Sequence, residues 1–185
     1  MKKHILISLR MTVILTLITC GIYPLAVYAV GQLAFRNKAN GSLVEHNGRI
    51  VGSELIGQAF ASERYFHSRP SAAGTDGYDG TASGGTNFGP TSKKLAGSIA
   101  AAVKSFDVHS NVPADAVTAS ASGLDPHISP ENAYAQSARV ARANGMSLAA
   151  VHALIARHTE GRLLGVFGEP RVNTLLLNLD LGKRQ

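Results

Sequence analysis

Residues 11–35 decide the architecture of this chain, and they read MTVILTLITCGIYPLAVYAVGQLAF. The run is 25 residues long, contains no charged side chain, and lies between Arg10 and Arg36. A helix rises about 1.5 Å per residue, so about 20 apolar residues already cross a hydrocarbon core roughly 30 Å thick. The run therefore predicts one helix that spans a membrane, with residues 1–10 as a short basic tail and residues 36–185 as the extramembrane part.

A cleaved secretory signal is the main alternative for this segment, with Val27-Tyr28-Ala29 as its cleavage site. Signal peptides have a shorter apolar core than this run. A lipoprotein signal would place a small residue before the cysteine, whereas Thr19 precedes Cys20. The full length of the run and the basic pair Arg36 and Lys38 after it favour an uncleaved anchor.

The orientation of the anchor follows less directly, because basic residues flank both of its ends. A ten-residue basic tail normally stays in the cytoplasm. We therefore expect a single-pass protein of the cell inner membrane, with the N-terminus in the cytoplasm and the domain in the periplasm. The lipid bilayer is one expected partner.

The distribution of charge and cysteine excludes several classes of function. The net charge is +6, but residues 1–36 contain four basic residues and no acidic one, which leaves 14 basic and 12 acidic residues elsewhere. The basic character thus comes from the flanks of the apolar segment, and nucleic-acid binding is disfavoured. A single cysteine excludes an internal disulfide and a cysteine-rich zinc site.

The apolar segment also carries a polar stripe with the spacing of one helix face. Its members are Ser8, Thr12, Thr16, Thr19 and Tyr23. Small polar residues in a membrane helix allow a neighbouring helix to approach and bond, so the stripe is a candidate partner-helix contact. Alternatively, the hydroxyls bond back to carbonyl groups of their own helix. Pro24 is expected to kink the helix or to mark its outer quarter.

Residues 36–185 predict one α+β domain. Strand signals surround turns in the first part, and capping residues mark helix starts further on. Strands are expected over 43–45, from residue 50 and over 172–181, and helices over 54–60, 91–106, 130–145 and 147–159. Between them, residues 71–90 are rich in glycine, have no apolar periodicity and predict a long loop.

The polar residues of the domain do not form a recognised catalytic pattern. His67, Asp79 and His127 are candidates for a membrane-anchored extracytoplasmic enzyme, but the chain has no HExxH motif and no metal site is expected. Ser83-Gly84-Gly85 could present backbone N–H groups to an anion, yet it lacks the Gly-Lys-Ser/Thr ending of a P-loop. Residue chemistry alone therefore favours a membrane-anchored interaction domain without a catalytic site.

Three long strings add a family resemblance to this interpretation. Residues 65–72 read YFHSRPSA, residues 82–90 read ASGGTNFGP, and residues 117–130 read VTASASGLDPHISP. With GIYP at residues 21–24 and RVA at residues 139–141, these strings resemble the C subunit of the bacterial high-affinity potassium-transporting P-type ATPase, the Kdp complex. The resemblance covers nearly the whole chain in order.

The resemblance implies a non-catalytic, single-span accessory subunit. Its implied partners are a channel-like subunit that carries potassium and a P-type subunit that hydrolyses ATP. It also implies a catalytic chaperone that raises the ATP affinity of the hydrolysing subunit, with ATP shared between the two and no cofactor of its own. Nucleotide contacts would fall on Ser83, Gly84, Gly85 and Gln136.

That last implication conflicts with the expected topology, because a periplasmic domain does not meet cytoplasmic ATP. We therefore expect a role in assembly and stability of the complex from its outer face. An effect on ATP binding would then pass through the membrane helix.

Overall fold

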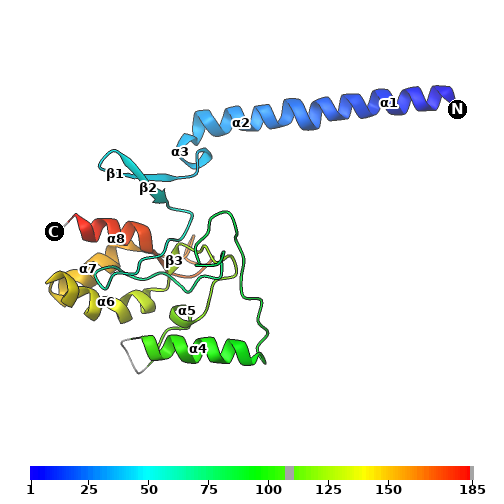
Figure 1. The fold of residues 1–185 in the computed structure, drawn as a ribbon. Coiled ribbons are helices and arrows are strands. Elements are labelled where there is room, and N and C mark those ends of the chain that lie inside the picture. Colours follow the sequence, from blue (N-terminus) through cyan, green and yellow to red (C-terminus); the bar gives the residue numbers. More distant parts are fainter. Residues whose placement is uncertain (107–110, 184–185) are drawn as a thin grey trace. The chain divides into compact units, whose positions relative to one another are not determined.

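The computed structural model describes residues 1–106 and 111–183 (Figure 1). The chain divides into two compact units, Met1–Leu43 and Val44–Gln185. The first contains α1 (Lys2–Thr16), the π-helical turn η1 (Leu17–Ile22) and α2 (Tyr23–Ala34), which follow one another without a break. Together they form a 33-residue helix whose most apolar window has a mean hydropathy of 2.1 and no buried residue. This confirms the predicted N-terminal apolar helix, which has the length and composition of a single membrane span.

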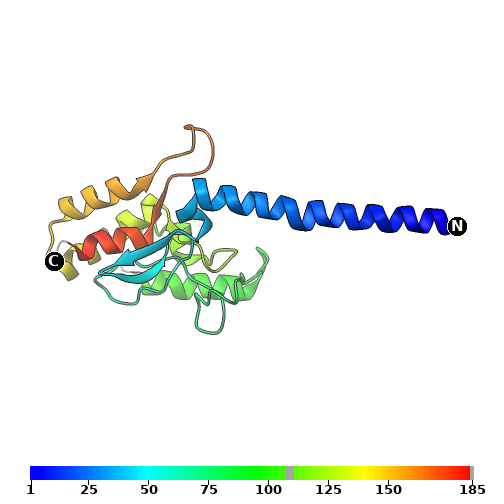
Figure 2. The same cartoon turned by 90° about the horizontal axis from the view of Figure 1, so that it is seen from above.

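The widened turn η1 explains how Pro24 fits into this helix. Proline has no N–H group and its ring displaces the carbonyl four residues earlier. Directly before it, the Tyr23 N–H donates to the Ile18 carbonyl, five residues back, instead of the usual four. The single π turn absorbs the mismatch, and the helix continues without a sharp kink (Figures 1 and 2). A short helix, α3 (Arg36–Ala39), follows it.

A hairpin opens the next part of the chain, as the turn signal in residues 46–49 predicts. Its strands are β1 (Leu43–His46) and β2 (Arg49–Ser53), which form a two-stranded sheet. Asn47 and Gly48 between them have φ values of 51° and 73°, the left-handed conformation that tight hairpin turns require.

The helix expected over 54–60 is wrong. Ser53 Oγ accepts a hydrogen bond from the Leu55 N–H at 3.1 Å, but the chain turns only once and then extends. Gly57 donates its N–H to the Leu124 carbonyl at 2.8 Å, and a Cβ at this position would lie 2.6 Å from the Asp125 carbonyl oxygen. A tertiary backbone contact therefore competes successfully with the local helix signal. From residue 54 to residue 92 the chain contains no helix or strand.

The three helices expected over 91–106, 130–145 and 147–159 are present, together with two further helices that the sequence did not predict. They are α4 (Lys93–Ser105), the short α5 (Ala114–Val117), α6 (Pro130–Asn144), α7 (Leu148–His158) and α8 (Thr174–Gly182). Ser92, Ser129 and Ser147 each accept a hydrogen bond from the backbone N–H three residues later. α6 ends at Gly145 in the left-handed conformation, as a C-terminal glycine cap requires.

The strand expected over 172–181 is wrong for most of its length. Only β5 (Arg171–Asn173) is extended, and it forms the centre of an antiparallel sheet in the order β3-β5-β4 with β3 (His127–Ile128) and β4 (Thr159–Glu160). Asn173 then caps α8, since its side chain accepts from the Leu176 N–H at 3.2 Å. The buried residues Thr174, Asn178 and Leu181 follow at helical spacing, which outweighs the partial alternation of the sequence.

The core lies among α6, α7, α8 and the small sheet. It consists of Phe66, Ile128, Ala133, Val140, Ala141, Val151, Leu154, Ile155, Val172, Leu177 and Leu181. Phe66 is fully buried although it belongs to the irregular segment before α4. That segment therefore forms part of the folded core, and helices are combined with a small antiparallel sheet, as in the predicted α+β class.

Candidate functional site

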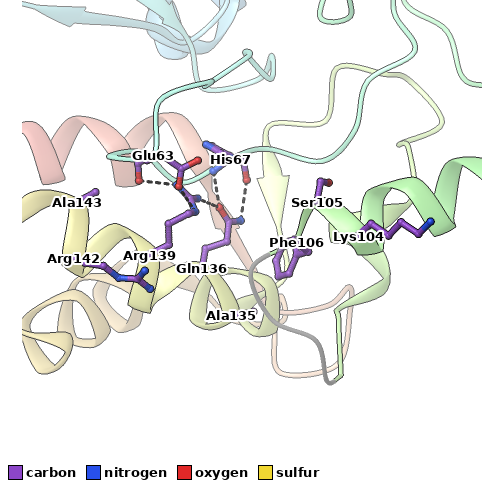
Figure 3. A pocket seen from close by; sticks show the side chains of 10 residues that line it. All are labelled: Glu63, His67, Lys104, Ser105, Phe106, Ala135, Gln136, Arg139, Arg142 and Ala143. Carbon is purple, nitrogen blue, oxygen red and sulfur yellow. Dashed lines mark hydrogen bonds and ion pairs between the residues drawn. The ribbon is translucent and has the colours of Figure 1, made fainter.

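A cavity of about 550 Å³ lies between the end of α4, one face of α6 and the extended segment before residue 68 (Figure 3). Its lining residues are Glu63, His67, Lys104, Ser105, Phe106, Ala135, Gln136, Arg139, Arg142 and Ala143. Gln136 and Arg139 project from the same face of α6 toward Glu63 and His67 (Figure 3). This cavity contains Gln136, one of the residues that the family resemblance assigns to nucleotide binding.

The side-chain amide of Gln136 is fully occupied by protein groups. Its Oε1 accepts from the His67 N–H at 2.7 Å and from Arg139 Nη2 at 2.7 Å. Its Nε2 donates to the His67 carbonyl at 3.0 Å and to Asn132 Oδ1 at 2.8 Å. A glutamine amide offers two donors and about two acceptor positions, so none is left over. A ligand that bonded this side chain would have to replace one of these contacts.

Arg139 fixes the segment beside His67. Its guanidinium donates to the carbonyl oxygens of Glu63 at 2.7 Å and Tyr65 at 3.0 Å, and its Nε lies 3.7 Å from a Glu63 carboxylate oxygen. One turn further along α6, Asn144 Nδ2 donates to the Arg64 carbonyl at 2.8 Å. α6 thus holds residues 63–67 almost residue by residue through side-chain-to-backbone bonds.

The electrostatics of this cavity favour neutral His67. Burial lowers the pKa of His67 below its ordinary value of 6.5, and the positive charge of Arg139 lowers it further. Hydrogen bonding to the Ser62 carbonyl, at 3.1 Å from Nε2, and the charge of Glu63 oppose the shift only in part. The imidazole is therefore a neutral structural group at pH 7.

Ser83, Gly84 and Gly85 lie outside the cavity of Gln136 and pack against the segment before Leu124. The Gly84 N–H and the Ser83 hydroxyl both donate to the Ser122 carbonyl, at 2.8 and 2.9 Å. A Cβ on Gly85 would lie 2.7 Å from the Ala121 carbonyl oxygen. The Gly84 N–H is therefore already bonded within the chain, and the absence of a side chain at Gly85 allows the two backbone segments to approach closely.

The three residues of the enzyme alternative do not line a common cavity. His67 lines the cavity described above, whereas His127 lines a second cavity of about 620 Å³. Asp79 is exposed and accepts from the N–H and hydroxyl of Thr81 at 2.8 and 2.7 Å, which lowers its pKa. Across residues 1–106 and 111–183, no three His, Cys, Asp or Glu side chains are placed to hold a metal ion.

His127 belongs to a small charged cluster with Asp125 and Arg69. Asp125 lies 3.5 Å from His127 Nδ1 and 3.3 Å from Arg69 Nη1, and it also accepts from the His127 N–H at 3.0 Å. Burial works against ionisation of Asp125, but the hydrogen bonds from His127 and the charge of Arg69 outweigh it and lower the pKa. The Asp125 carboxylate thus bonds the backbone at the start of β3, just before α6.

The polar stripe of the apolar helix makes hydrogen bonds within its own helix, which is one of the two behaviours considered for it. All five residues are exposed, as a partner contact requires. However, the Thr12 hydroxyl donates to the Ser8 carbonyl at 2.9 Å, and the Thr19 hydroxyl donates to the Leu15 carbonyl at 2.7 Å. These two threonines are thus satisfied within their own helix.

Sequence reasoning did not find two polar side chains that organise this region. Asn178 on α8 bonds both backbone groups of Phe66, and Asp115 on α5 accepts from the N–H and hydroxyl of Ser129 at 2.7 and 2.9 Å. Asn178 lies in an apolar run, where a lone amide signals a buried hydrogen bond. Asp115 had no such signal, because its partner lies on another element.

Comparison with known proteins places this chain in a family. The family described as "KdpC: K+-transporting ATPase, c chain" matches residues 5–183. A potassium-transporting ATPase KdpC subunit of Koribacter versatilis is 50% identical over 188 residues, which cover 100% of this chain and 97% of that protein. The KdpC subunit of Gemmatimonas aurantiaca is 55% identical over 98% of this chain and 93% of its own length. The corresponding protein of Myxococcus xanthus is 54% identical over 100% of this chain and 90% of its length.

These matches span both the apolar helix and the domain, and they agree with the resemblance carried by the three strings. The chain belongs to the KdpC family, the c chain of K+-transporting ATPases.

Proposed function

We propose that this chain is a non-catalytic accessory subunit of an ATP-driven potassium uptake pump. In this proposal it binds the channel-like potassium-translocating subunit and the P-type ATP-hydrolysing subunit, and it supports assembly and stability of their complex. The observation that carries the proposal is a 33-residue apolar helix without buried side chains, in a chain that belongs to the KdpC family. Nothing in the described residues favours the alternative of a membrane-anchored enzyme, since His67, Asp79 and His127 do not line a common cavity.

We place the N-terminus in the cytoplasm and the domain in the periplasm. The basic residues Lys2, Lys3 and Arg10 in the tail support this orientation, because basic tails are retained on the cytoplasmic side. The Arg36 and Lys38 pair at the other end acts against it. Alkaline phosphatase fused after residue 185 tests the orientation directly, because that enzyme is active only outside the cytoplasm.

We further propose that any rise in ATP affinity reaches the hydrolysing subunit through contacts between subunits, with no cofactor held by this chain. The occupied amide of Gln136 and the packed backbone of Ser83, Gly84 and Gly85 support this proposal. An allosteric effect requires contacts that differ between two states of the pump, and the exposed membrane helix is a candidate to make them.

Affinity purification of the tagged full-length chain in mild detergent tests the main proposal. Two large membrane subunits should co-purify in a constant ratio, and the preparation should hydrolyse ATP in a potassium-dependent manner. A chain that always purifies alone from cells expressing the pump would contradict it. Substitution of His67, Asp79 and His127 should then change activity only as far as it changes the amount of folded protein.

A further inference from the structure

The segment between α7 and β5 presents an apolar surface that the fold of this chain does not use. Four large side chains at its tip are exposed: Leu163 at 70%, Leu164 at 83%, Val166 at 71% and Phe167 at 64%. The segment projects from the body of the domain in Figure 2. We call these four residues the apolar tip.

The apolar tip has a defined backbone conformation. Leu163 and Phe167 exchange two backbone hydrogen bonds, with N–H to carbonyl distances of 2.8 and 3.0 Å. Further bonds within the turn run from Gly165 to the Arg162 carbonyl at 3.1 Å and from Val166 to the Leu163 carbonyl at 3.2 Å. The four side chains are therefore held outward on an ordered turn, which reduces the entropy lost when they bind.

The backbone conformation of Leu164 is unfavourable for a leucine. Its φ of 54° is left-handed, a conformation that asparagine and glycine adopt far more readily than leucine. Its side chain gains nothing in return within the chain, because it is almost fully exposed. A residue that is locally unfavourable and contributes nothing to the core points to a contact outside the chain.

The charges around the apolar tip distinguish between a lipid surface and a protein surface as its partner. Two ion pairs close its base: Arg162 with Glu169 at 2.6 Å, and, between β4 and β5, Glu160 with Arg171 at 2.9 Å. Each basic group is thus neutralised by an acid, so the base offers no net positive charge to anionic lipid headgroups. An apolar centre with a polar rim is instead the composition of a protein–protein interface.

We propose that the apolar tip docks into an apolar pocket on another protein subunit of the potassium pump. This inference rests on the proposed function, since it presumes that the chain assembles with larger subunits. It goes further by assigning the contact to Leu163, Leu164, Val166 and Phe167. The bilayer is not the expected occupant, because each basic group at the base of the apolar tip is paired with an acid.

Leu164→Asn provides a sharp test, because asparagine suits the left-handed backbone. The purified full-length variant in detergent should melt at the same temperature as the wild type or higher. The same variant should retain the large subunits at least tenfold less well in a salt-washed affinity purification. The matched control is Leu55→Asn, which removes another leucine that is 61% exposed and should leave co-purification unchanged.

A photoreactive benzoylphenylalanine in place of Phe167 identifies the occupant in the intact complex. Crosslinking to a larger subunit of the pump supports the proposal. Crosslinking only to lipid or to a second copy of the chain overturns it, as does full retention of the large subunits by Leu164→Asn. If the wild-type chain itself retains no partner, the proposed function fails. If the wild-type chain retains the large subunits and Leu164→Asn retains them equally well, only the docking proposal fails.

Discussion

Asn178 on α8 holds the backbone of Phe66 with both ends of its side-chain amide. Nδ2 donates to the Phe66 carbonyl at 2.9 Å, and Oδ1 accepts from the Phe66 N–H at 2.8 Å. Gln136 on α6 makes the same pair of bonds to His67, the next residue. Consecutive residues of an extended segment are therefore bonded by amides from two helices, much as they would be bonded by neighbouring strands in a sheet.

Replacing Asn178 with alanine should destabilise the domain strongly. The change leaves the N–H and carbonyl of Phe66 without partners in the core, and each such buried group costs about 1–3 kcal/mol. We expect a loss of about 2–4 kcal/mol in the free energy of unfolding, measured by urea unfolding of the full-length protein in detergent. Asn144→Ala is the matched control, because it removes an amide from a more exposed bond to Arg64 and should cost about 1 kcal/mol. Equal losses for both variants would contradict the argument.

Gly84 and Gly85 should respond differently to alanine. A Cβ at Gly85 would meet the Ala121 carbonyl oxygen at 2.7 Å, whereas at Gly84 the nearest atom, the Ala82 carbonyl oxygen, is 3.9 Å away. Gly85→Ala should therefore lower the free energy of unfolding by about 1–3 kcal/mol, and Gly84→Ala should change it by less than about 0.5 kcal/mol. If the loop cradled a phosphate through its backbone, both variants would lower the ATP affinity of the assembled pump. We expect that affinity, measured per folded complex, to be unchanged by Gly84→Ala.

His67 should make the domain less stable in mild acid. Its pKa in the folded protein lies below the ordinary value of 6.5, so the unfolded chain binds a proton more readily. The contribution of this group to stability is complete above pH 6.5 and is lost as the pH falls from there through the folded-state pKa. The carboxyl of Asp125 has a lowered pKa as well, but its contribution is lost only as the pH falls below its ordinary value of 3.8.

Urea unfolding of wild type and His67→Gln between pH 5 and pH 8 would measure this effect. The wild type should lose stability below about pH 6.5 relative to the variant, because glutamine does not titrate. Parallel pH profiles for the two proteins would show that burial of His67 has no effect on proton binding.

Asp115 and Ser129 should be energetically coupled. The carboxylate of Asp115 accepts from the N–H and hydroxyl of Ser129 and from Asn132 Nδ2, so it stands beside the first turn of α6, where a negative charge is favoured. A double-mutant cycle with Asp115→Ala and Ser129→Ala should give an interaction energy of about 1–2 kcal/mol in urea unfolding. Additive losses would mean that the helix cap acts without the carboxylate.

The predictions that succeeded from sequence depend on local chemistry. The apolar run gave a membrane-length helix, and the serines at 92, 129 and 147 marked the starts of α4, α6 and α7. The failures at residues 54–60 and 172–181 have a common cause, since in both places the decisive partners are distant in sequence. Gly57 bonds Leu124, and the face of α8 is buried by the core.

The sequence likewise predicted only part of the candidate site. The string around Ser83 supported the family resemblance, and the resemblance in turn implied a role for Gln136, but the sequence did not show that Ser83 lies outside the cavity of Gln136. Sequence also did not show that the amide of Gln136 bonds the backbone of His67, because that residue lies 69 positions away along the chain.

By itself, the sequence determined an apolar helix of membrane-spanning length, an α+β domain with well-placed helix caps, and membership of a family, because length, hydropathy, capping residues and motifs are properties of contiguous residues. Only the tertiary structure decided that residues 63–67 are held by amide and guanidinium groups of α6 and α8, and that the apolar tip stays exposed. The physical reason is that burial and the choice of hydrogen-bond partners depend on which distant segments come into contact. A local sequence pattern does not determine those contacts.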